Sequence, residues 1–208
     1  MNRGETHAAP VPQRKQEPRS GQKRIGHLVL VAGISASGKT SLLARLRDDP
    51  VIRARLDLPA LRPRIVNAMD LGDLPQGFIP SLVIHYDLMR PIRHGFESYS
   101  DDPALLVLRE AHLLHSVILA QSVPELRNRL CARFPDPTAK MRYEKFAEPG
   151  FVVGRYRKWL AYWDSLASAP PHRLLKSDEH YSLLPSRAAL LSLVDHIRVS
   201  PPDNHRST

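Results

Sequence analysis

The feature that most restricts the fold is an apolar run that ends in a glycine loop and continues as a helical pattern. Residues 25–33 (IGHLVLVAG) form a short, mostly apolar run bounded by glycine, which predicts a buried strand. Residues 34–39 (ISASGK) are mostly small and polar, and residues 40–49 (TSLLARLRDD) place their leucines on one helical face. A strand that passes through a tight loop into a helix is typical of α/β proteins.

The rest of the chain continues this alternation. The patterns predict further strands in residues 62–71, 79–91, 115–122 and 171–178, and helices in residues 101–111, 123–134, 142–167 and 186–197. Asp102 and Pro103 are suited to a helix start, the long helical pattern is interrupted near Pro149 and Gly150, and Ser186 is the expected N-cap of the last helix. Together these patterns predict an α/β fold, a three-layer sandwich with a mostly parallel five-stranded sheet.

The composition indicates a folded domain between two tails. Hydrophobic residues make up 42% and charged residues 25% of the 208 residues, close to globular averages. Residues 1–24 carry six Lys and Arg against two acids and have no apolar periodicity, which predicts a disordered basic tail. A second loose tail is predicted in residues 200–208, so the folded domain is expected to span residues 25–199.

The formal charge of +9 raises the question of a nucleic-acid partner. Because nearly half of this excess belongs to the basic tail, the chain is not expected to bind nucleic acid, although the tail could steer it to an acidic protein partner. No apolar stretch approaches the roughly 20 residues of a membrane span, and no signal peptide is predicted. The single cysteine, Cys131, excludes an internal disulfide and a Cys-based zinc site. We therefore expect a cytoplasmic protein that does not bind membranes.

The loop after the first strand meets every fixed position of the pattern G-x-x-x-x-G-K-[ST], with Gly33, Gly38, Lys39 and Thr40. Gly33 permits a tight exit from the strand, and Gly38 lets the backbone approach phosphates. Backbone N–H groups at a helix start bind anions, Lys39 can reach the β- and γ-phosphates, and the Thr40 hydroxyl can ligate Mg²⁺. The loop therefore predicts a site for a nucleoside triphosphate, taken to be ATP, with Mg²⁺; its binding residues are Gly33, Ser35, Ala36, Ser37, Gly38, Lys39, Thr40 and Ser41.

Through the stretch GISASGKTS, residues 33–41, the chain resembles the P-loop NTPase superfamily. The resemblance implies the fold of P-loop containing nucleoside triphosphate hydrolases and leaves the substrate open. Asp87, which follows the apolar run of residues 81–86, resembles the Walker B aspartate that serves the metal in such proteins. It would hold Mg²⁺ through water or accept a proton from a substrate hydroxyl; the alternative is a carboxylate that caps the next turn. Asp70 is the rival for either role.

Further polar residues crowd around Asp87 in the sequence. They are expected at the carboxyl end of a strand, the edge at which open α/β sheets bind ligands. Arginines there would suit an anionic substrate or product, whereas the histidines lack the spacing of a metal site and are interpreted as polar neighbours. The residues concerned are His85, Arg90, Arg93 and His94.

Residues 116–134 (SVILAQSVPELRNRLCARF) resemble the fourth strand and the lid-bearing helix of small-molecule kinases of the shikimate and gluconate kinase type. The resemblance implies that Arg127, Arg129 and Arg133 are candidates for stabilising the transferred phosphoryl group; a solvated helix face is the alternative. It also implies that the last predicted strand leads into a loop near the base. The chain has no room after Asp70 for the insertion of nucleoside monophosphate kinases, and it lacks the N-K-x-D of regulatory GTPases.

The predicted function is that of an ATP- and Mg²⁺-dependent phosphotransferase that acts on the hydroxyl of a small, unidentified molecule. Its predicted catalytic residues are Lys39, Asp87, Arg127 and Arg133, and its predicted metal ligands are Thr40 and Asp87. Two alternatives stay open: a nucleotide-binding regulator or partner protein with little turnover, and a sulfotransferase-like enzyme.

Aromatic residues recur at helical spacing near the C-terminal third of the chain. Tyr156, Trp159 and Trp163 are one turn apart, with Tyr162 beside them. They would form either a lid or base-stacking surface, or the apolar face of an amphipathic helix that enters the core.

Overall fold

A computed structural model describes residues 23–56, 58, 63–133, 148, 150–167, 169–170 and 172–195. The greater part of the predicted basic tail, residues 1–22, lies outside these residues, as does the predicted tail of residues 200–208. The same holds for residues 142–147 of the long helical pattern.

Five strands form a single sheet in which every pairing is parallel. The predicted α/β class and five-stranded sheet are confirmed, and the sheet is entirely rather than mostly parallel. The first strand is central, and its last residue, Gly33, pairs in register with Asp87 of the neighbouring strand. In the order β2-β3-β1-β4-β5 the strands are β2 (Arg64–Asn67), β3 (Ile79–Asp87), β1 (Ile25–Gly33), β4 (Ala111–Ala120) and β5 (His172–Lys176).

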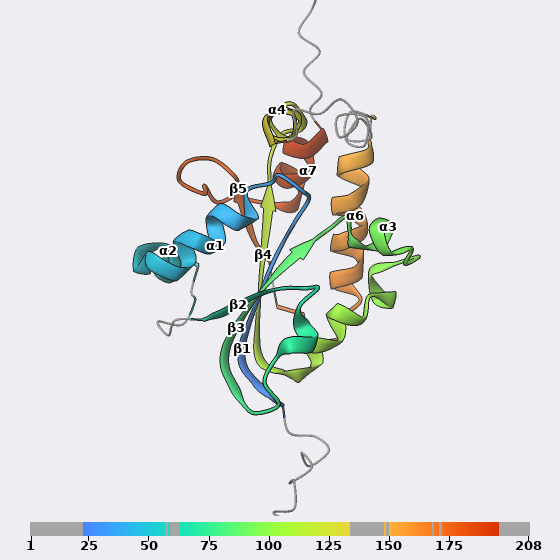
Figure 1. The fold of residues 1–208 in the computed structure, drawn as a ribbon. Coiled ribbons are helices and arrows are strands. Elements are labelled where there is room, and N and C mark those ends of the chain that lie inside the picture. Colours follow the sequence, from blue (N-terminus) through green and yellow to red (C-terminus); the bar gives the residue numbers. More distant parts are fainter. Residues whose placement is uncertain are drawn as a thin grey trace, which may run out of the picture.

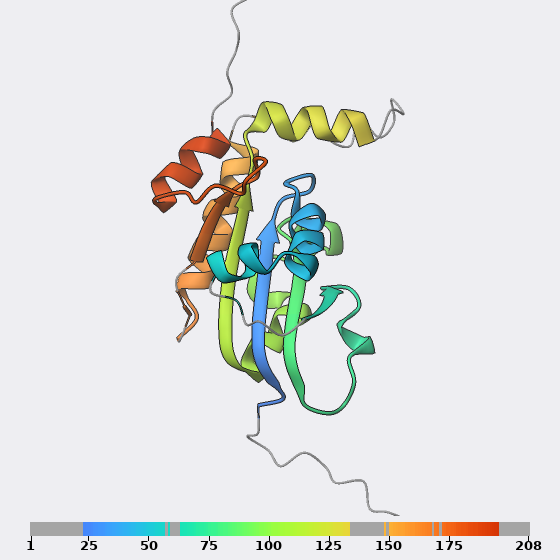
Figure 2. The ribbon, with the colours of Figure 1, turned by 90° about the vertical axis from the view of Figure 1, so that its left-hand side faces the viewer.

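Helices cover both faces of the sheet, an arrangement consistent with a three-layer sandwich (Figure 1). On one face lie α1 (Lys39–Asp48) and α2 (Pro50–Arg55); on the other lie α6 (Phe151–Asp164) and α7 (Arg187–Asp195). The helix α4 (Val123–Arg133) crosses above the carboxyl ends of the strands, as the view in Figure 2 also shows. The Ser186 hydroxyl accepts a hydrogen bond from the N–H of Ala189 at 3.1 Å, which confirms the predicted cap of α7.

Short helical segments make up the connections next to the site. The connection from β2 to β3 contains η1 (Leu71–Asp73), and that from β3 to β4 contains α3 (Arg90–His94), η2 (Tyr99–Asp101) and η3 (Pro103–Glu110). The helix predicted in residues 101–111 is therefore a 3₁₀ segment, although it begins at the expected Asp102, whose carboxylate accepts a hydrogen bond from the N–H of Ala104. It leads directly into β4, which begins four residues earlier than the predicted strand of residues 115–122.

The core explains the recurring aromatic residues. Tyr156 and Trp159 are fully buried and Trp163 nearly so, in the cluster between α6 and the sheet. The Trp159 ring stacks at 5.2 Å on the Tyr86 ring of β3. The core interpretation is thus confirmed and the lid interpretation is wrong.

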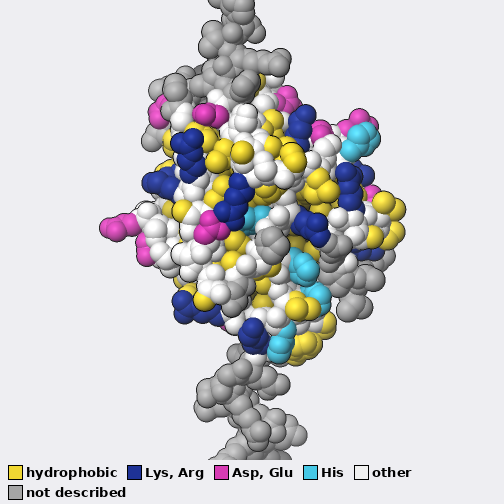
Figure 3. Space-filling model, turned by 180° about the vertical axis from the view of Figure 1, so that it is seen from behind, with side chains coloured by type: hydrophobic (Ala, Val, Ile, Leu, Met, Phe, Trp, Pro, Cys, Tyr) yellow, Lys and Arg dark blue, Asp and Glu magenta, His cyan; other side chains and the backbone are white. Residues whose placement is uncertain are grey.

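Two features of the described residues bear on membranes and on surface charge. No helix in the described ranges is long and apolar enough to cross a membrane. On the face shown in Figure 3, Lys and Arg side chains are dispersed among hydrophobic and acidic ones and do not gather into one patch.

Candidate functional site

The loop between β1 and α1 is shaped by close packing and by left-handed backbone. A Cβ at Gly33 would meet the carbonyl oxygen of Leu119 and the hydroxyl of the fully buried Ser37, both at 2.6 Å. Ala36 and Gly38 have φ of 63° and 87°, so the chain turns sharply before the helix begins. Because its N-cap is Gly38, α1 has no capping side chain, and its first N–H groups are available to an anion.

The ammonium group of Lys39 is buried at the start of α1. The side chain is turned back onto the loop, and Nζ donates hydrogen bonds to the carbonyl oxygens of Gly33 and Ile34, both at 2.7 Å. Burial lowers the pKa of Lys39 to about 8, against the opposing charge of Asp87 and with smaller contributions from Arg93 and Arg133. The site therefore holds a cation that has lost its water and that a bound anion would stabilise.

Asp87 ends β3 directly beside Gly33 and is tied to both the loop and α3. Its Oδ2 accepts a hydrogen bond from Ser35 Oγ at 2.7 Å and lies 3.0 Å from Nη1 of Arg93. Its Oδ1 accepts from the N–H of Met89 at 3.0 Å. Burial alone would raise the pKa of Asp87. The combined effect of Lys39, these hydrogen bonds and Arg93 is larger and opposite, so the carboxylate is ionised with a pKa below its ordinary value.

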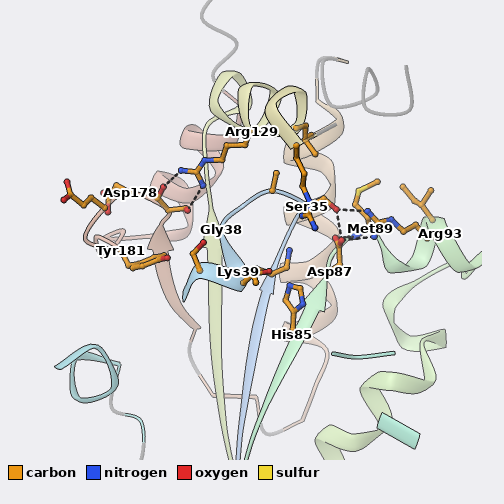
Figure 4. A pocket seen from close by; sticks show the side chains of 18 residues that line it. Ser35, Gly38, Lys39, His85, Asp87, Met89, Arg93, Arg129, Asp178 and Tyr181 are labelled. Carbon is orange, nitrogen blue, oxygen red and sulfur yellow. Dashed lines mark hydrogen bonds and ion pairs between the residues drawn. The ribbon is translucent and has the colours of Figure 1, made fainter. Parts of the chain in front are cut away.

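A cavity of about 1130 Å³ opens above this edge of the sheet. Figure 4 shows Asp87, Met89 and Arg93 on one side of the cavity and Arg129 and Tyr181 on the opposite side. Gly38 and Lys39 lie between the two sides. A cavity of this size lies slightly above the usual range for small-molecule sites, roughly 300–1,000 Å³.

Most residues predicted from the sequence line this cavity. From the loop and α1 they are Ser35, Ala36, Gly38, Lys39, Thr40 and Ser41; from elsewhere they are Asp87, Arg129 and Arg133. Gly33 and Ser37 are instead buried within the loop and shape it. Arg127 is exposed on α4 and is not among the lining residues, so its side chain is not brought together with Lys39 and Asp87.

The polar residues grouped around Asp87 in sequence separate in space. His85 lines the cavity, and its Nδ1 is 2.8 Å from Oδ1 of Asn67. Burial and the nearby Lys39 lower the pKa of His85 to about 4, so the ring is neutral at physiological pH. Asp70, the rival of Asp87, is exposed outside the cavity and accepts a hydrogen bond from Asn67 at 3.1 Å.

Arg90 and His94 serve the surroundings of the site and do not line it. The Arg90 guanidinium forms a buried, two-pronged ion pair with Asp102 at 2.8 and 3.0 Å. The exposed His94 ring stacks on Phe96 with centroids 5.7 Å apart. The expectation that Arg90 would suit an anionic ligand is therefore not met, because α3 turns its Arg93 toward the loop and its Arg90 toward the core.

The resemblance implied a loop near the base after the last strand, but it singled out none of the residues that this segment contributes. Ser177 accepts two hydrogen bonds from Arg129, at its hydroxyl at 3.0 Å and at its carbonyl at 3.1 Å, and Asp178 and Tyr181 line the cavity. Ser177 and Asp178 directly follow a strand, so the expectation that parallel strands end at one edge could have found them. The hydroxyl of Tyr156 donates to the carbonyl of Leu119 at 2.8 Å and accepts from the N–H of Ile34 at 3.5 Å, so α6 supports the loop. The distance of Tyr156 from the loop in sequence gave no indication of this.

Neither the protein-family models nor the curated proteins provide a match for this chain. The cavity combines a helix start, a buried ammonium group and an ionised carboxylate. Such a set can bind an anion at the loop and can order or deprotonate a polar group beside Asp87.

The close approach of Gly38 to Ser177 can be tested by substitution. Gly38→Ala is expected to lower the free energy of unfolding by about 1–3 kcal/mol, because its Cβ would press on the Ser177 hydroxyl and its φ of 87° is left-handed. Gly95 also has a left-handed φ, of 71°, but a Cβ there would meet nothing, so this position separates the backbone cost from the cost of the contact. Gly95→Ala is expected to lower the free energy of unfolding by about 1 kcal/mol. Gly72→Ala, at an open position of ordinary φ, should be near neutral. Urea denaturation measures all three, and equal losses at Gly38 and Gly95 would argue against the close contact.

Proposed function

We propose that the chain binds a nucleoside triphosphate, ATP, with Mg²⁺ in this cavity and transfers its terminal phosphoryl group to a hydroxyl of a small molecule. Residues 33–41 would then be a P-loop and the domain a P-loop fold. The observation that carries the proposal is the juxtaposition of Lys39, buried at the start of α1, with Asp87 at the end of the adjacent strand. A helix start, a lysine and an acid are the combination with which P-loop proteins bind a triphosphate and its metal.

The charges of the cavity suit a polyphosphate. Lys39, Arg93, Arg129 and Arg133 line it, and Arg93 and Arg133 are near enough to lower the pKa of Lys39. These cations repel one another, so an anion among them would relieve the repulsion and pair with the desolvated ammonium. The first N–H groups of α1 would add hydrogen bonds to the same anion.

The oxygen donors beside Lys39 fit Mg²⁺. This ion uses one or two carboxylates and takes its remaining oxygens from phosphates and water. Asp87 and the hydroxyls of Thr40 and Ser35 would hold it, and the ion would supply charge neutralisation to the transferred group.

The acceptor would occupy the side of the cavity next to Asp87. There the carboxylate lies beside neutral His85, with Met89 and Ile92 as apolar neighbours. Asp87 can orient an incoming hydroxyl or accept its proton, and Arg133 can stabilise charge on the phosphoryl group as it moves. This division of roles would suit a small, partly apolar alcohol.

The test is ATP turnover by the full chain with a panel of hydroxyl-bearing metabolites. The proposal predicts slow turnover alone and a rise of at least about tenfold with a suitable acceptor, accompanied by a phosphorylated product. Saturable nucleotide binding without any stimulated turnover would favour the regulator over the enzyme.

Nucleotide affinity is expected to fall as the pH rises above 8. Lys39 is a cation below its pKa of about 8, and because phosphate stabilises the cation, binding raises that pKa. At higher pH the free protein must take up a proton to bind, so affinity should drop by up to about tenfold per pH unit. The stability of the free protein changes with pH in the opposite direction. The Lys39 ammonium lowers the stability of the fold below pH 8, and this penalty fades as the pH rises toward 10.5.

Calorimetric titrations with a non-hydrolysable ATP analogue measure this effect. At about pH 9, titrations in two buffers of different ionisation enthalpy should reveal proton uptake, whereas at about pH 7 the uptake should be near zero. The same affinity and no proton uptake at both values would contradict a functional role for the shifted pKa.

A further inference from the structure

Arg93 holds the two side-chain groups that a metal ion would approach. Its Nη1 lies 3.0 Å from Oδ2 of Asp87, and its Nη2 donates a hydrogen bond to Ser35 Oγ at 2.7 Å. Ser35 Oγ in turn donates to the same oxygen of Asp87 at 2.7 Å. The three side chains form a closed triangle on the α3 side of the cavity (Figure 4).

The lysine of the loop does not take this position. Lys39 Nζ makes its hydrogen bonds to the backbone carbonyls of Gly33 and Ile34, and the ion pair of Asp87 is with Arg93. The direct ion-pair partner of the carboxylate thus comes from a different segment, α3, whereas Lys39 stabilises the carboxylate without a hydrogen bond to it.

The Arg93 side chain can move away from Asp87 into solvent. It is 49% exposed, whereas that of Asp87 is 18% exposed. One turn earlier in α3, Arg90 is anchored by its buried pair with Asp102, so the Arg93 side chain can swing toward solvent while the helix stays in place.

We propose that Arg93 stays ion-paired with Asp87 until the nucleotide binds. The site would then exclude free divalent metal and accept it only together with a triphosphate. This inference rests on the function proposed above. A divalent ion alone would meet a carboxylate that is already neutralised and a guanidinium that repels it. A triphosphate brings about four negative charges, which give Arg93 a new partner and the metal additional ligands. The arginine acts as a repulsive element that sets specificity.

The experiment measures Mn²⁺ binding to the full chain without nucleotide, by electron paramagnetic resonance. Mn²⁺ prefers oxygen ligands, as Mg²⁺ does. The resonance signal gives the concentration of free Mn²⁺, from which the bound fraction follows. Arg93→Met is expected to bind Mn²⁺ at least about tenfold more tightly than the wild type, because it frees the carboxylate and removes the repulsion. Arg93→Lys keeps the charge and should remain close to the wild type. Arg157→Met removes a charge from an exposed position on α6 and should have no effect.

Equal Mn²⁺ affinity in the wild type and in Arg93→Met, with both folded by thermal unfolding, would overturn the inference. So would an equal gain in Arg93→Lys, which would point to a structural effect of the substitution and not to charge. A repeat with a non-hydrolysable ATP analogue separates the two proposals. If the analogue leaves the Mn²⁺ affinity of every variant unchanged, the proposed function fails. The exclusion of free metal by Arg93 is judged only from the nucleotide-free comparison.

Discussion

Asp102→Ala is expected to lower the free energy of unfolding by roughly 3–5 kcal/mol. The carboxylate is fully buried and accepts hydrogen bonds from Arg90 Nε at 2.8 Å and Nη2 at 3.0 Å, from the Tyr86 hydroxyl at 2.8 Å and from the N–H of Ala104 at 3.0 Å. Its removal leaves a guanidinium buried without a counter-ion and a hydroxyl without an acceptor. Urea denaturation measures the loss.

The chain offers a matched control in a second two-pronged pair. Asp164 accepts from Arg187 at 2.6 Å twice, but both side chains are about half exposed, so Asp164→Ala should cost no more than about 1 kcal/mol. Similar losses in Asp102→Ala and Asp164→Ala would show that burial does not set the difference.

The buried pair also matters to the cavity. Tyr86 precedes Asp87 in β3, and Arg90 lies one turn before Arg93 in α3. Asp102 accepts hydrogen bonds from both Tyr86 and Arg90. It therefore fixes β3, which presents Asp87 to the site, and α3, which presents Arg93. Asp102→Ala is therefore expected to weaken function even where the variant remains folded.

Asp87→Asn is expected to reduce acceptor-stimulated turnover by roughly 10²–10⁴-fold, with a much smaller change in nucleotide affinity. The amide oxygen can still accept the hydrogen bond from the N–H of Met89, and the Ser35 hydroxyl can turn to accept from the amide NH₂, so the shape of the side chain is retained. What it loses is the negative charge and the ability to take up a proton. Steady-state kinetics separates kcat from KM, and titration with the analogue gives the affinity.

Asp70→Asn is the matched control for this assignment. Asp70 follows the neighbouring strand β2 and was the rival from sequence, but it lies outside the cavity. Its substitution should leave turnover within about twofold. If Asp70→Asn abolished turnover and Asp87→Asn did not, the roles given to the two aspartates would be wrong.

The parts of the site that could be predicted are those encoded within a few residues. The glycines, Lys39 and Thr40 of the loop are local, and Asp87 is recognisable because it ends an apolar run. Their meeting in one cavity follows from the rule that parallel strands end at a common edge. The alternation of strands and helices similarly gave the fold class and the five strands.

The remaining features depend on contacts between distant segments. The triangle of Ser35, Asp87 and Arg93 requires the register that sets Gly33 beside Asp87 and the turn of α3, neither of which is written in a local pattern. Asp102 was interpreted only as a helix cap, because its buried pair with Arg90 is a tertiary contact. Sequence spacing also could not distinguish Arg129, which reaches Ser177, from Arg127, which is exposed on the same helix.

The most direct test of the central claim is a calorimetric titration of the full chain with a non-hydrolysable ATP analogue and Mg²⁺. The account predicts one saturable site in the wild type, binding at least roughly 100-fold weaker in Lys39→Met, and no change in the exposed-site control Arg157→Met. A wild-type chain that fails to bind the analogue, or a Lys39→Met variant that binds it equally well, would contradict a triphosphate site at this loop.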